Sequence, residues 1–334
     1  MDIQKLLLPV SLFIAFTSAF AQPAKKSKEQ AKHESSYEGK TLSPKDNPDL
    51  LPYNRWITPA GTQVYFGNPS LENHALDVAL SPDEKWVAVE GRYEVVILSA
   101  ETGKLVANLP LSGLIQGQNL MNTFSGICWL QEENQYKLYW GSVGGKGVSF
   151  VMEAAWDGKK IAGSDSYTFP TEVPAGNALP NEVLVQNEGG KNYLYVVLNG
   201  TNQVVKLDFA TKTKIWTSPV GVAPFGIAKA NGKIYVTNWA GAVPEKNDPN
   251  VAGVPWGSAK VDPRTGATRE GTVSVLDLET GKALKEITVG LHPNDILASA
   301  DGKFVFVANA NSDCVSTISA STDEVSETIS VRLS

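Results

Sequence analysis

Short apolar stretches closed by turn residues recur along the chain about every 45 to 60 residues. The clearest copy is residues 232–238, with the sequence Gly-Lys-Ile-Tyr-Val-Thr-Asn, and weaker copies lie at 86–89, 193–196 and 304–307. The turns before the weaker copies contain Pro-Asp-Glu, Gly-Gly or Asp-Gly, and such residues let the chain reverse between two strands of matched twist. Each copy therefore predicts a β-hairpin.

A second pattern follows each hairpin. Residues 272–277 form one apolar stretch and residues 283–289 form another, with Thr280-Gly281-Lys282 between them. The same arrangement recurs around Thr102-Gly103-Lys104, Thr211-Lys212-Thr213 and Thr322-Asp323-Glu324. Each repeat is therefore expected to hold four short strands.

Four-stranded modules at this spacing are typical of β-propeller blades. The sequence predicts an all-β propeller over residues 49–334 with WD40-like blades at 71–112, 113–173, 174–219, 220–289 and 290–332. A charged fraction of 19% suits a globular chain with a large core. After the first residues, no helical periodicity continues for three turns.

The first residues are typical of export. Lys5 supplies a positive charge, residues 6–16 are apolar, and Ala19-Phe20-Ala21 resembles a cleavage site, so residues 1–21 are predicted to be a signal peptide. The apolar run is too short to span a bilayer, and a buried N-terminal helix is the weaker alternative. Residues 22–48 read as a flexible tether. We expect a periplasmic or secreted protein without a transmembrane segment.

Charge and cysteine content narrow the possibilities. The chain carries a net charge of −6. This balance disfavours nucleic acid or an anionic membrane as the partner of the propeller, although it also suits solubility alone. Cys128 and Cys314 fall in different blades, so we expect two buried free thiols rather than a disulfide.

Polar residues precede or begin the innermost strand of several blades, and loops at these positions gather at one rim of a propeller. The candidate rim residues are His74, Asp77, Asn181, Glu182, Phe225, His292, Asn294 and Asp295. Such a ring could hold a divalent cation or a cationic small ligand. The alternative is that these groups bond to backbone and to water between the blades. No other cofactor is predicted, and no catalytic residue stands out.

One insertion interrupts the regular spacing. Residues 239–271 lie between the second and third strands of the fourth blade and show no apolar periodicity, which is typical of functional or mobile loops. Trp239, Trp256 and Arg264 in this insertion are residue types that dominate binding surfaces. Equally, Trp256 could hold the loop against its own blade.

The same region resembles a known family. Residues 235–239 (Tyr-Val-Thr-Asn-Trp), 261–266, 271–277 and 292–296, together with 307–313, resemble the YVTN-repeat, YncE-like β-propellers that bacteria fuse to phosphoesterases of the alkaline phosphatase type. The resemblance covers the chain from about residue 57 to its end. It implies a propeller, commonly of seven blades, with hydrolysis in a separate C-terminal domain whose active-site residues have no counterpart here.

A lone strand is predicted at residues 61–67, with no blade to join, because residues 324–331 already complete the last blade. An incomplete ring would expose apolar faces of the first and last blades and favour self-association through open edges. We therefore expect a longer parent protein, a partner, or a rearranged closed ring of five blades.

Three hypotheses of function follow. The leading one is an exported, non-catalytic module that binds a protein or a small molecule through its rim and insertion. The second is a component of a periplasmic phosphoesterase whose catalytic domain lies outside this chain. The third is a propeller that binds a metal or cofactor, as quinoproteins do.

Overall fold

The computed structural model describes residues 41–42, 49–51, 55–57, 61–68, 71, 74–132, 135–170, 176–255 and 257–332. The predicted signal peptide and most of the predicted tether lie outside these residues. The described part is all-β, with one 3₁₀ turn, η2 (Gly145–Gly147). In that part, no helix is long or apolar enough to cross a membrane.

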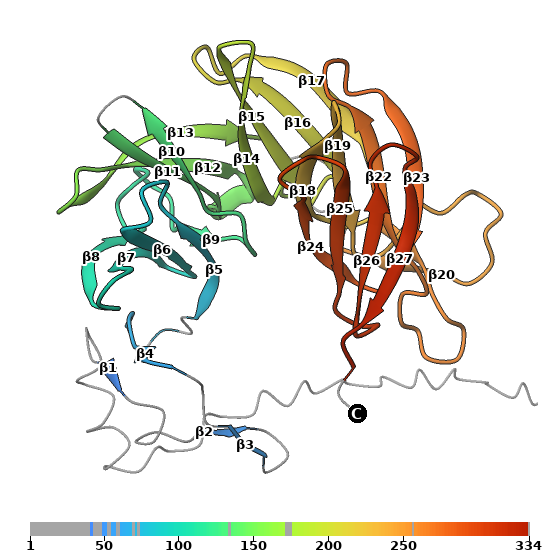
Figure 1. The fold of residues 1–334 in the computed structure, drawn as a ribbon, viewed down its shortest axis with the longest axis horizontal. Helices are drawn as coiled ribbons and strands as arrows, with labels where there is room; N and C mark the ends of the chain where they lie inside the picture. Colours follow the sequence, from blue (N-terminus) through green and yellow to red (C-terminus); the bar gives the residue numbers. More distant parts are fainter. Residues whose placement is uncertain are drawn as a thin grey trace, which may run out of the picture. The chain divides into compact units, whose positions relative to one another are not determined.

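Five antiparallel sheets follow one another along the chain, and four successive strands build each of them except where the insertion intervenes (Figure 1). Sheet 1 contains β5 (Ala75–Leu80), β6 (Trp86–Gly91), β7 (Glu94–Ser99) and β8 (Leu105–Pro110). Sheet 2 contains β10 (Cys128–Glu132), β11 (Gln135–Val143), β12 (Ser149–Trp156) and β13 (Ile161–Phe169), and β9 (Met121–Asn122) also pairs with β11.

Sheet 3 contains β14 (Pro180–Glu188), β15 (Lys191–Leu198), β16 (Gln203–Asp208) and β17 (Lys214–Pro219). Sheet 4 contains β18 (Pro224–Ala230), β19 (Lys233–Asn238), β22 (Gly271–Asp277) and β23 (Ala283–Val289). Sheet 5 contains β24 (Pro293–Ala298), β25 (Phe304–Asn309), β26 (Cys314–Ser319) and β27 (Glu324–Ser330). The prediction of a propeller built from four-stranded sheets is confirmed.

The turn between the third and fourth strand has one recurring conformation. Gly103, Lys212, Gly281 and Asp323 all have positive φ, between 55° and 71°, at corresponding places in sheets 1, 3, 4 and 5. In sheet 4, the Asp277 carboxylate accepts a hydrogen bond from the backbone N–H of Thr280 at 2.9 Å and fixes the turn. A residue in the left-handed region is what this reversal requires, and glycine adopts it at no steric cost.

The hydrophobic core is divided into layers between consecutive sheets, and we call each such contact a junction. Ile97 and Trp140 lie in the layer between sheets 1 and 2, whereas Tyr235, Val305 and Ile318 lie in the layer between sheets 4 and 5. All five are fully buried. Burial of each such side chain contributes about 1.5–3 kcal/mol, so the junctions hold the array together.

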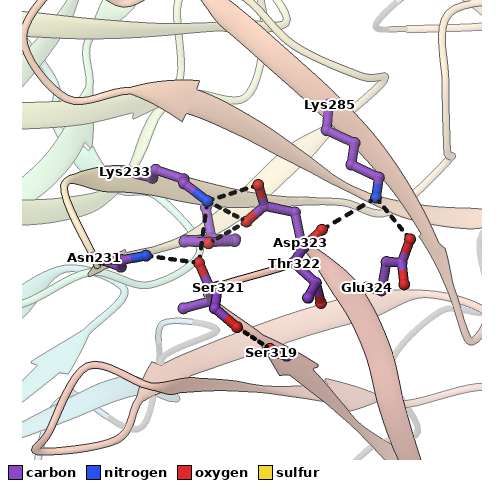
Figure 2. Close-up of polar contacts among 10 residues, drawn as sticks. Asn231, Lys233, Lys285, Ser319, Ser321, Thr322, Asp323 and Glu324 are labelled. Carbon is purple, nitrogen blue, oxygen red and sulfur yellow. Dashed lines mark hydrogen bonds and ion pairs between the residues drawn. The ribbon is translucent and has the colours of Figure 1, made fainter.

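Polar contacts complete the junction between sheets 4 and 5 (Figure 2). The Nζ of Lys233 lies 2.7 Å from an Asp323 carboxylate oxygen and 3.0 Å from the carbonyl oxygen of Ala320. The Asn231 side chain donates to the same carbonyl at 2.9 Å. The turn between β26 and β27 is therefore bound to the preceding sheet through both its backbone and its side chain.

The segments before sheet 1 contain short strands. The strand expected at residues 61–67 is shorter, β4 (Gln63–Val64), and it pairs with β1 (Thr41–Leu42) within the supposed tether. A further hairpin joins β2 (Asp49–Leu51) to β3 (Arg55–Ile57). Two-residue strands leave too short a pattern to recognise by periodicity.

The insertion in sheet 4 also has structure of its own. Its β20 (Val251–Val254) and β21 (Gly257–Lys260) form a hairpin, and Val261 pairs with Thr268 beyond it. Apolar periodicity did not indicate these strands, because they are short and contain glycine. The insertion does leave sheet 4 between its second and third strands, since β19 pairs directly with β22.

Both cysteines are free, as expected. The two residues are partly exposed rather than fully buried, and each begins its strand. Burial of its sulfur and the nearby carboxylates of Glu182 and Asp77 still raise the pKa of Cys128 to about 12. A thiol with so high a pKa is a poor nucleophile at neutral pH.

Candidate ligand site at the inner edge of the sheets

The first strands of the sheets contact one another and form what we call the inner edge: β5, β10, β14, β18 and β24. Three of these strands begin in the same way, with a left-handed residue followed by proline. Leu179, Ala223 and His292 have φ values of 49°, 54° and 54°. Such a conformation is uncommon for residues other than glycine, and it persists only where the surrounding structure fixes it.

A register shift follows each of these prolines. The pairing skips from Pro180 to Val183, from Pro224 to Ile227 and from Pro293 to Ile296. The skipped positions contain the predicted site residues Asn181, Glu182, Phe225, Asn294 and Asp295. Because a bulge redirects side chains away from the ladder, these residues are available for contacts beyond their own sheet.

Hydrogen bonds link the inner edge from one sheet to the next. An Asp77 carboxylate oxygen accepts from the backbone N–H of Gly126 at 2.7 Å. The Asn181 side chain donates to the Ser125 hydroxyl at 3.2 Å and to the carbonyl of Phe225 at 3.0 Å. The Thr237 hydroxyl donates to the carbonyl of Asn294 at 2.8 Å. The alternative of structural bonding therefore holds for Asp77 and Asn181, which join neighbouring sheets.

Glu182 lies within a group of carboxylates. Its side chain is partly buried and accepts only a long hydrogen bond, 3.5 Å, from the Ser125 hydroxyl. Burial raises its pKa to about 8, and the carboxylates of Asp77 and Asp295 contribute to the shift. Near neutral pH Glu182 is therefore mostly protonated, and a cation bound close to it would favour its ionised form.

Glu90 is a member of this group that sequence reasoning missed. It is opposite Asp77 in the ladder between β5 and β6 and is completely buried. Among the described residues, neither of its carboxyl oxygens has a hydrogen-bond partner. Burial, followed by the charges of Asp77 and Glu182, raises its pKa. Its sequence neighbours form an ordinary strand pattern, so only the pairing with Asp77 could have indicated its place.

Aromatic rings gather at the same edge. The Trp239 ring stacks on Phe225 with centroids 4.2 Å apart and an interplanar angle of 20°. His292 meets Trp239 at 4.5 Å and 66°, and Phe124 lies 5.9 Å from it. We call these four side chains the aromatic cluster. Burial lowers the pKa of His292, so its imidazole is neutral at pH 7.

Trp239 belongs to both surfaces that the sequence suggested separately, namely the insertion and the rim at the inner edge. It follows β19 at the start of the insertion and also packs on the small core formed by Val222, Ala223, Ala240 and Ala259. Ala259 belongs to β21, so the hairpin of the insertion supports the tryptophan from behind. The insertion therefore contributes to the inner edge through Trp239.

The remaining predicted residues are placed differently. His74 is exposed, and its backbone carbonyl accepts from the N–H of Arg92 at 3.2 Å. Arg264 has an 87% exposed side chain and lies 3.8 Å from the Asp262 carboxylate in a turn of the insertion. Neither has a contact with the aromatic cluster among the described residues. Trp256 lies outside the residues that the structure describes.

A metal centre was another expectation for this edge. Within the described ranges, no group of three or more His, Cys, Asp or Glu side chains is arranged to hold a metal ion. The carboxylates supply negative charge and the aromatic rings supply π-faces at this edge.

Comparison with solved structures supports the fold. The chain is similar to the Dos1 propeller, with 10% identity and a TM-score of 0.50 over 86% of this chain and 62% of the Dos1 chain. It is also similar to a protein of unknown function from Bacteroides caccae, with 11% identity and a TM-score of 0.51 over 83% of this chain and 86% of the other. The chain thus spans less than two thirds of the Dos1 structure.

A weaker similarity joins the chain to the dihydro-heme d1 dehydrogenase NirN, at 15% identity and a TM-score of 0.45 over 76% of this chain and 47% of the other, which supports no inference. No protein-family model matches the chain. No curated protein matches it significantly. At such low identities, the similarities show a β-propeller fold and nothing about its ligand.

Proposed function

We propose that this chain is an exported, non-catalytic β-propeller module that binds a small organic cation at its inner edge. The observation that carries the proposal is the stack of Phe225 on Trp239, closed by His292, on the same inner edge as Glu182, whose neighbour Asn181 donates to the carbonyl of Phe225. Aromatic faces attract cations through the ring quadrupole, and quaternary ammonium groups are the usual ligands of such clusters.

The charges near the cluster favour the same class of ligand. The charges of Asp77 and Asp295 help to raise the pKa of Glu182, so ionisation of Glu182 is unfavourable without a counter-charge. A bound cation would supply that charge. His292 would not oppose it, because the lowered pKa keeps the imidazole neutral.

Export and the lack of catalysis rest on the sequence. The charged and apolar start of the chain supports export, and the resemblance to YVTN-repeat propellers supports a binding role, since that family places hydrolysis in a separate domain. On this interpretation the chain would serve as the binding part of a larger phosphoesterase-linked protein.

Choline and its neutral isostere 3,3-dimethylbutan-1-ol provide the test. Titration of the purified chain, followed by tryptophan fluorescence and calorimetry, should show that choline binds at least about tenfold more tightly than the isostere. The affinity should rise with pH as Glu182 ionises near pH 8. Equal affinity for the two ligands would refute a site that recognises positive charge.

Three variants locate the site. Trp239→Ala should abolish choline binding, Glu182→Gln should weaken it and remove much of its pH dependence, and Arg264→Ala should leave it unchanged because Arg264 is exposed in a separate turn. Added Ca²⁺ serves as a competitor. If Ca²⁺ displaces choline through Glu182, the hard-cation alternative replaces this proposal.

A further inference from the structure

Equivalent positions can be recognised from sheet to sheet. Tyr195, Tyr235 and Phe306 lie on the second strands of sheets 3, 4 and 5, opposite Lys206, Val275 and Thr317 on the third strands. Each third-strand residue is followed six positions later by the left-handed turn residue, Lys212, Gly281 or Asp323. Residues of one sheet can therefore be assigned to their counterparts in another.

At three junctions, a backbone carbonyl of the later sheet accepts a hydrogen bond from the sheet before it. This carbonyl lies three residues before the left-handed turn residue in each case. The carbonyl of Phe209 in sheet 3 accepts from the Tyr167 hydroxyl of sheet 2 at 3.2 Å. The carbonyl of Leu278 in sheet 4 accepts from Lys206 of sheet 3 at 3.2 Å. The carbonyl of Ala320 in sheet 5 accepts from Lys233 of sheet 4 at 3.0 Å. Three successive junctions thus use a backbone carbonyl at the same equivalent position as the acceptor.

Among the residues that the structure describes, no other sheet packs on one face of sheet 5, here called the trailing face. Leu297 lies opposite Phe306 on this face, and Val315 lies opposite Ile329. Leu297 is 67% exposed and Ile329 is 42% exposed. In sheet 4, by contrast, Tyr235 at the position of Phe306 is completely buried by sheet 5. The trailing face therefore has the apolar character of a junction without its cover.

One face of sheet 1, here called the leading face, is exposed along its first strand. Val78 is 61% exposed and Leu80 is 54% exposed, whereas Val89 and Val96, which continue the same face on β6 and β7, are 5% and 0% exposed. The counterparts of Val78 and Leu80 in sheet 5, Ile296 and Ala298, belong to the core shared with sheet 4. The correspondence follows from identical turns, because the Ser81 hydroxyl bonds to Asp83 and the Ser299 hydroxyl to Asp301, each at 2.7 Å.

The leading face also exposes the residue whose backbone carbonyl corresponds to the acceptor at the other junctions. Ala100 in sheet 1 corresponds to Ala320, and it is exposed, whereas Ala320 is completely buried. The exposed first strand and turn of the leading face thus match the part of sheet 5 that meets sheet 4 at their junction.

Charges on the two faces are complementary. At the junction between sheets 4 and 5, the Nζ of Lys285 lies 3.5 Å from the Oε1 of Glu324. The equivalent positions on the free faces are Glu327 on β27, opposite Thr317, and Lys104, directly after Gly103. The signs are reversed but again opposite, so the free faces would attract each other where the internal junction does.

We propose that the trailing face of sheet 5 binds the leading face of sheet 1 in a second copy of this chain. Val78 and Leu297 are both more than half exposed in the same molecule, so the two faces do not cover each other within one chain. Two different surfaces meet in such an interface, which makes the association head to tail. It lies on the faces of the array and is independent of the ligand at the inner edge.

Complementation of two blocked variants tests the proposal. Leu297→Glu removes the trailing face, and Val78→Glu removes the leading face. By sedimentation velocity, the wild-type chain should self-associate, each variant alone should be monomeric, and an equimolar mixture of the two should form dimers that grow no further. Val243→Glu, an exposed apolar position in the insertion, is the matched control and should associate like the wild type.

Every other outcome overturns the proposal. A monomeric wild type would show that the chain closes on itself or needs a different partner, and a mixture that stays monomeric would show that the faces do not meet. If either Glu variant lost its β-type circular dichroism, the pair Leu297→Ser and Val78→Ser would replace it, with an expected loss of affinity of at least about tenfold.

A charge exchange gives a second measurement. Glu327→Lys and Lys104→Glu should each weaken self-association about twofold to fivefold, and the double variant should restore it. Raised salt should diminish these differences, because both side chains are exposed. Weakening by both single changes without restoration in the double variant would contradict the assigned register.

Discussion

At the residue scale, the most unusual groups are two carboxylic acids in places where water solvates a charge poorly. Within the part of the chain that the structure describes, Glu90 is completely buried without a hydrogen-bond partner, and Glu182 accepts one long hydrogen bond. An ionised carboxylate in such a place is costly, so both groups hold their protons above the ordinary pKa. The inner edge therefore stores protons that the unfolded chain would release.

This storage predicts a dependence of stability on pH. The pKa of Glu182 is about 8 in the folded chain against an ordinary value of 4.5, so its contribution is fully present below about pH 4.5 and is lost as the pH rises through 8. Between these values the free energy of unfolding should fall by up to about 1.4 kcal/mol per pH unit for this group. Urea denaturation at a series of pH values measures the slope.

Glu182→Gln should remove the part of that slope that corresponds to about one bound proton. Glu90, which also holds a proton in the folded chain, should account for the slope that remains. Glu101→Gln, an exposed residue in a turn of sheet 1, is the control and should leave the slope unchanged. A slope that is identical in the wild type and in Glu182→Gln would mean that Glu182 is ionised in the folded chain at pH 7.

At the element scale, the sequence predicted the turns and strands, because these depend on residues that are close together in the chain. Gly103, Lys212, Gly281 and Asp323 mark one turn because each lies between two apolar stretches and takes a left-handed conformation. Turn residues and strand periodicity are local signals, so the four-stranded sheets could be predicted from them.

Contacts between distant segments were harder to predict. Trp239 was assigned to the insertion, and Phe225 to the rim, because nothing in the spacing shows that their rings stack. Glu90 looked like any strand residue until the pairing placed it opposite Asp77. The β20–β21 hairpin escaped notice because four-residue strands containing glycine have almost no pattern to detect.

Gly126 shows how closely the inner strands approach one another. Its φ of 107° is unfavourable for any side chain, and an added Cβ would overlap the carbonyl oxygen of Asn181 in the next sheet. Gly126→Ala should therefore lower the free energy of unfolding by about 2–4 kcal/mol and weaken choline binding, because sheets 2 and 3 must separate. Denaturant unfolding and the choline titration measure the two effects.

Gly113 provides the matched control for this substitution. It also has a positive φ, 85°, but an added Cβ would meet nothing within 4 Å. Gly113→Ala should cost only the backbone strain, about 1 kcal/mol. Equal losses at the two positions would show that the contact with Asn181 has no effect on stability.

At the scale of the whole molecule, each sheet shares its core with its neighbours along the chain. Ile97 and Trp140 belong to the layer between sheets 1 and 2, and Val305 and Ile318 belong to the layer between sheets 4 and 5. Stability in such an array is approximately the sum of the sheets and their junctions. A change in one layer should then be felt mainly by the two sheets that share it.

Ile318→Ala tests this division into layers. Ile318 is completely buried between sheets 4 and 5, so its truncation should cost about 2–5 kcal/mol. Hydrogen exchange followed by mass spectrometry should show the loss of protection in β18–β27, with β5–β13 retaining theirs. Ile97→Ala, equally buried between sheets 1 and 2, should give the reverse pattern. A uniform loss over all five sheets in both variants would mean that the array unfolds as one cooperative unit, because only then would a cavity in one layer expose the amides of every other.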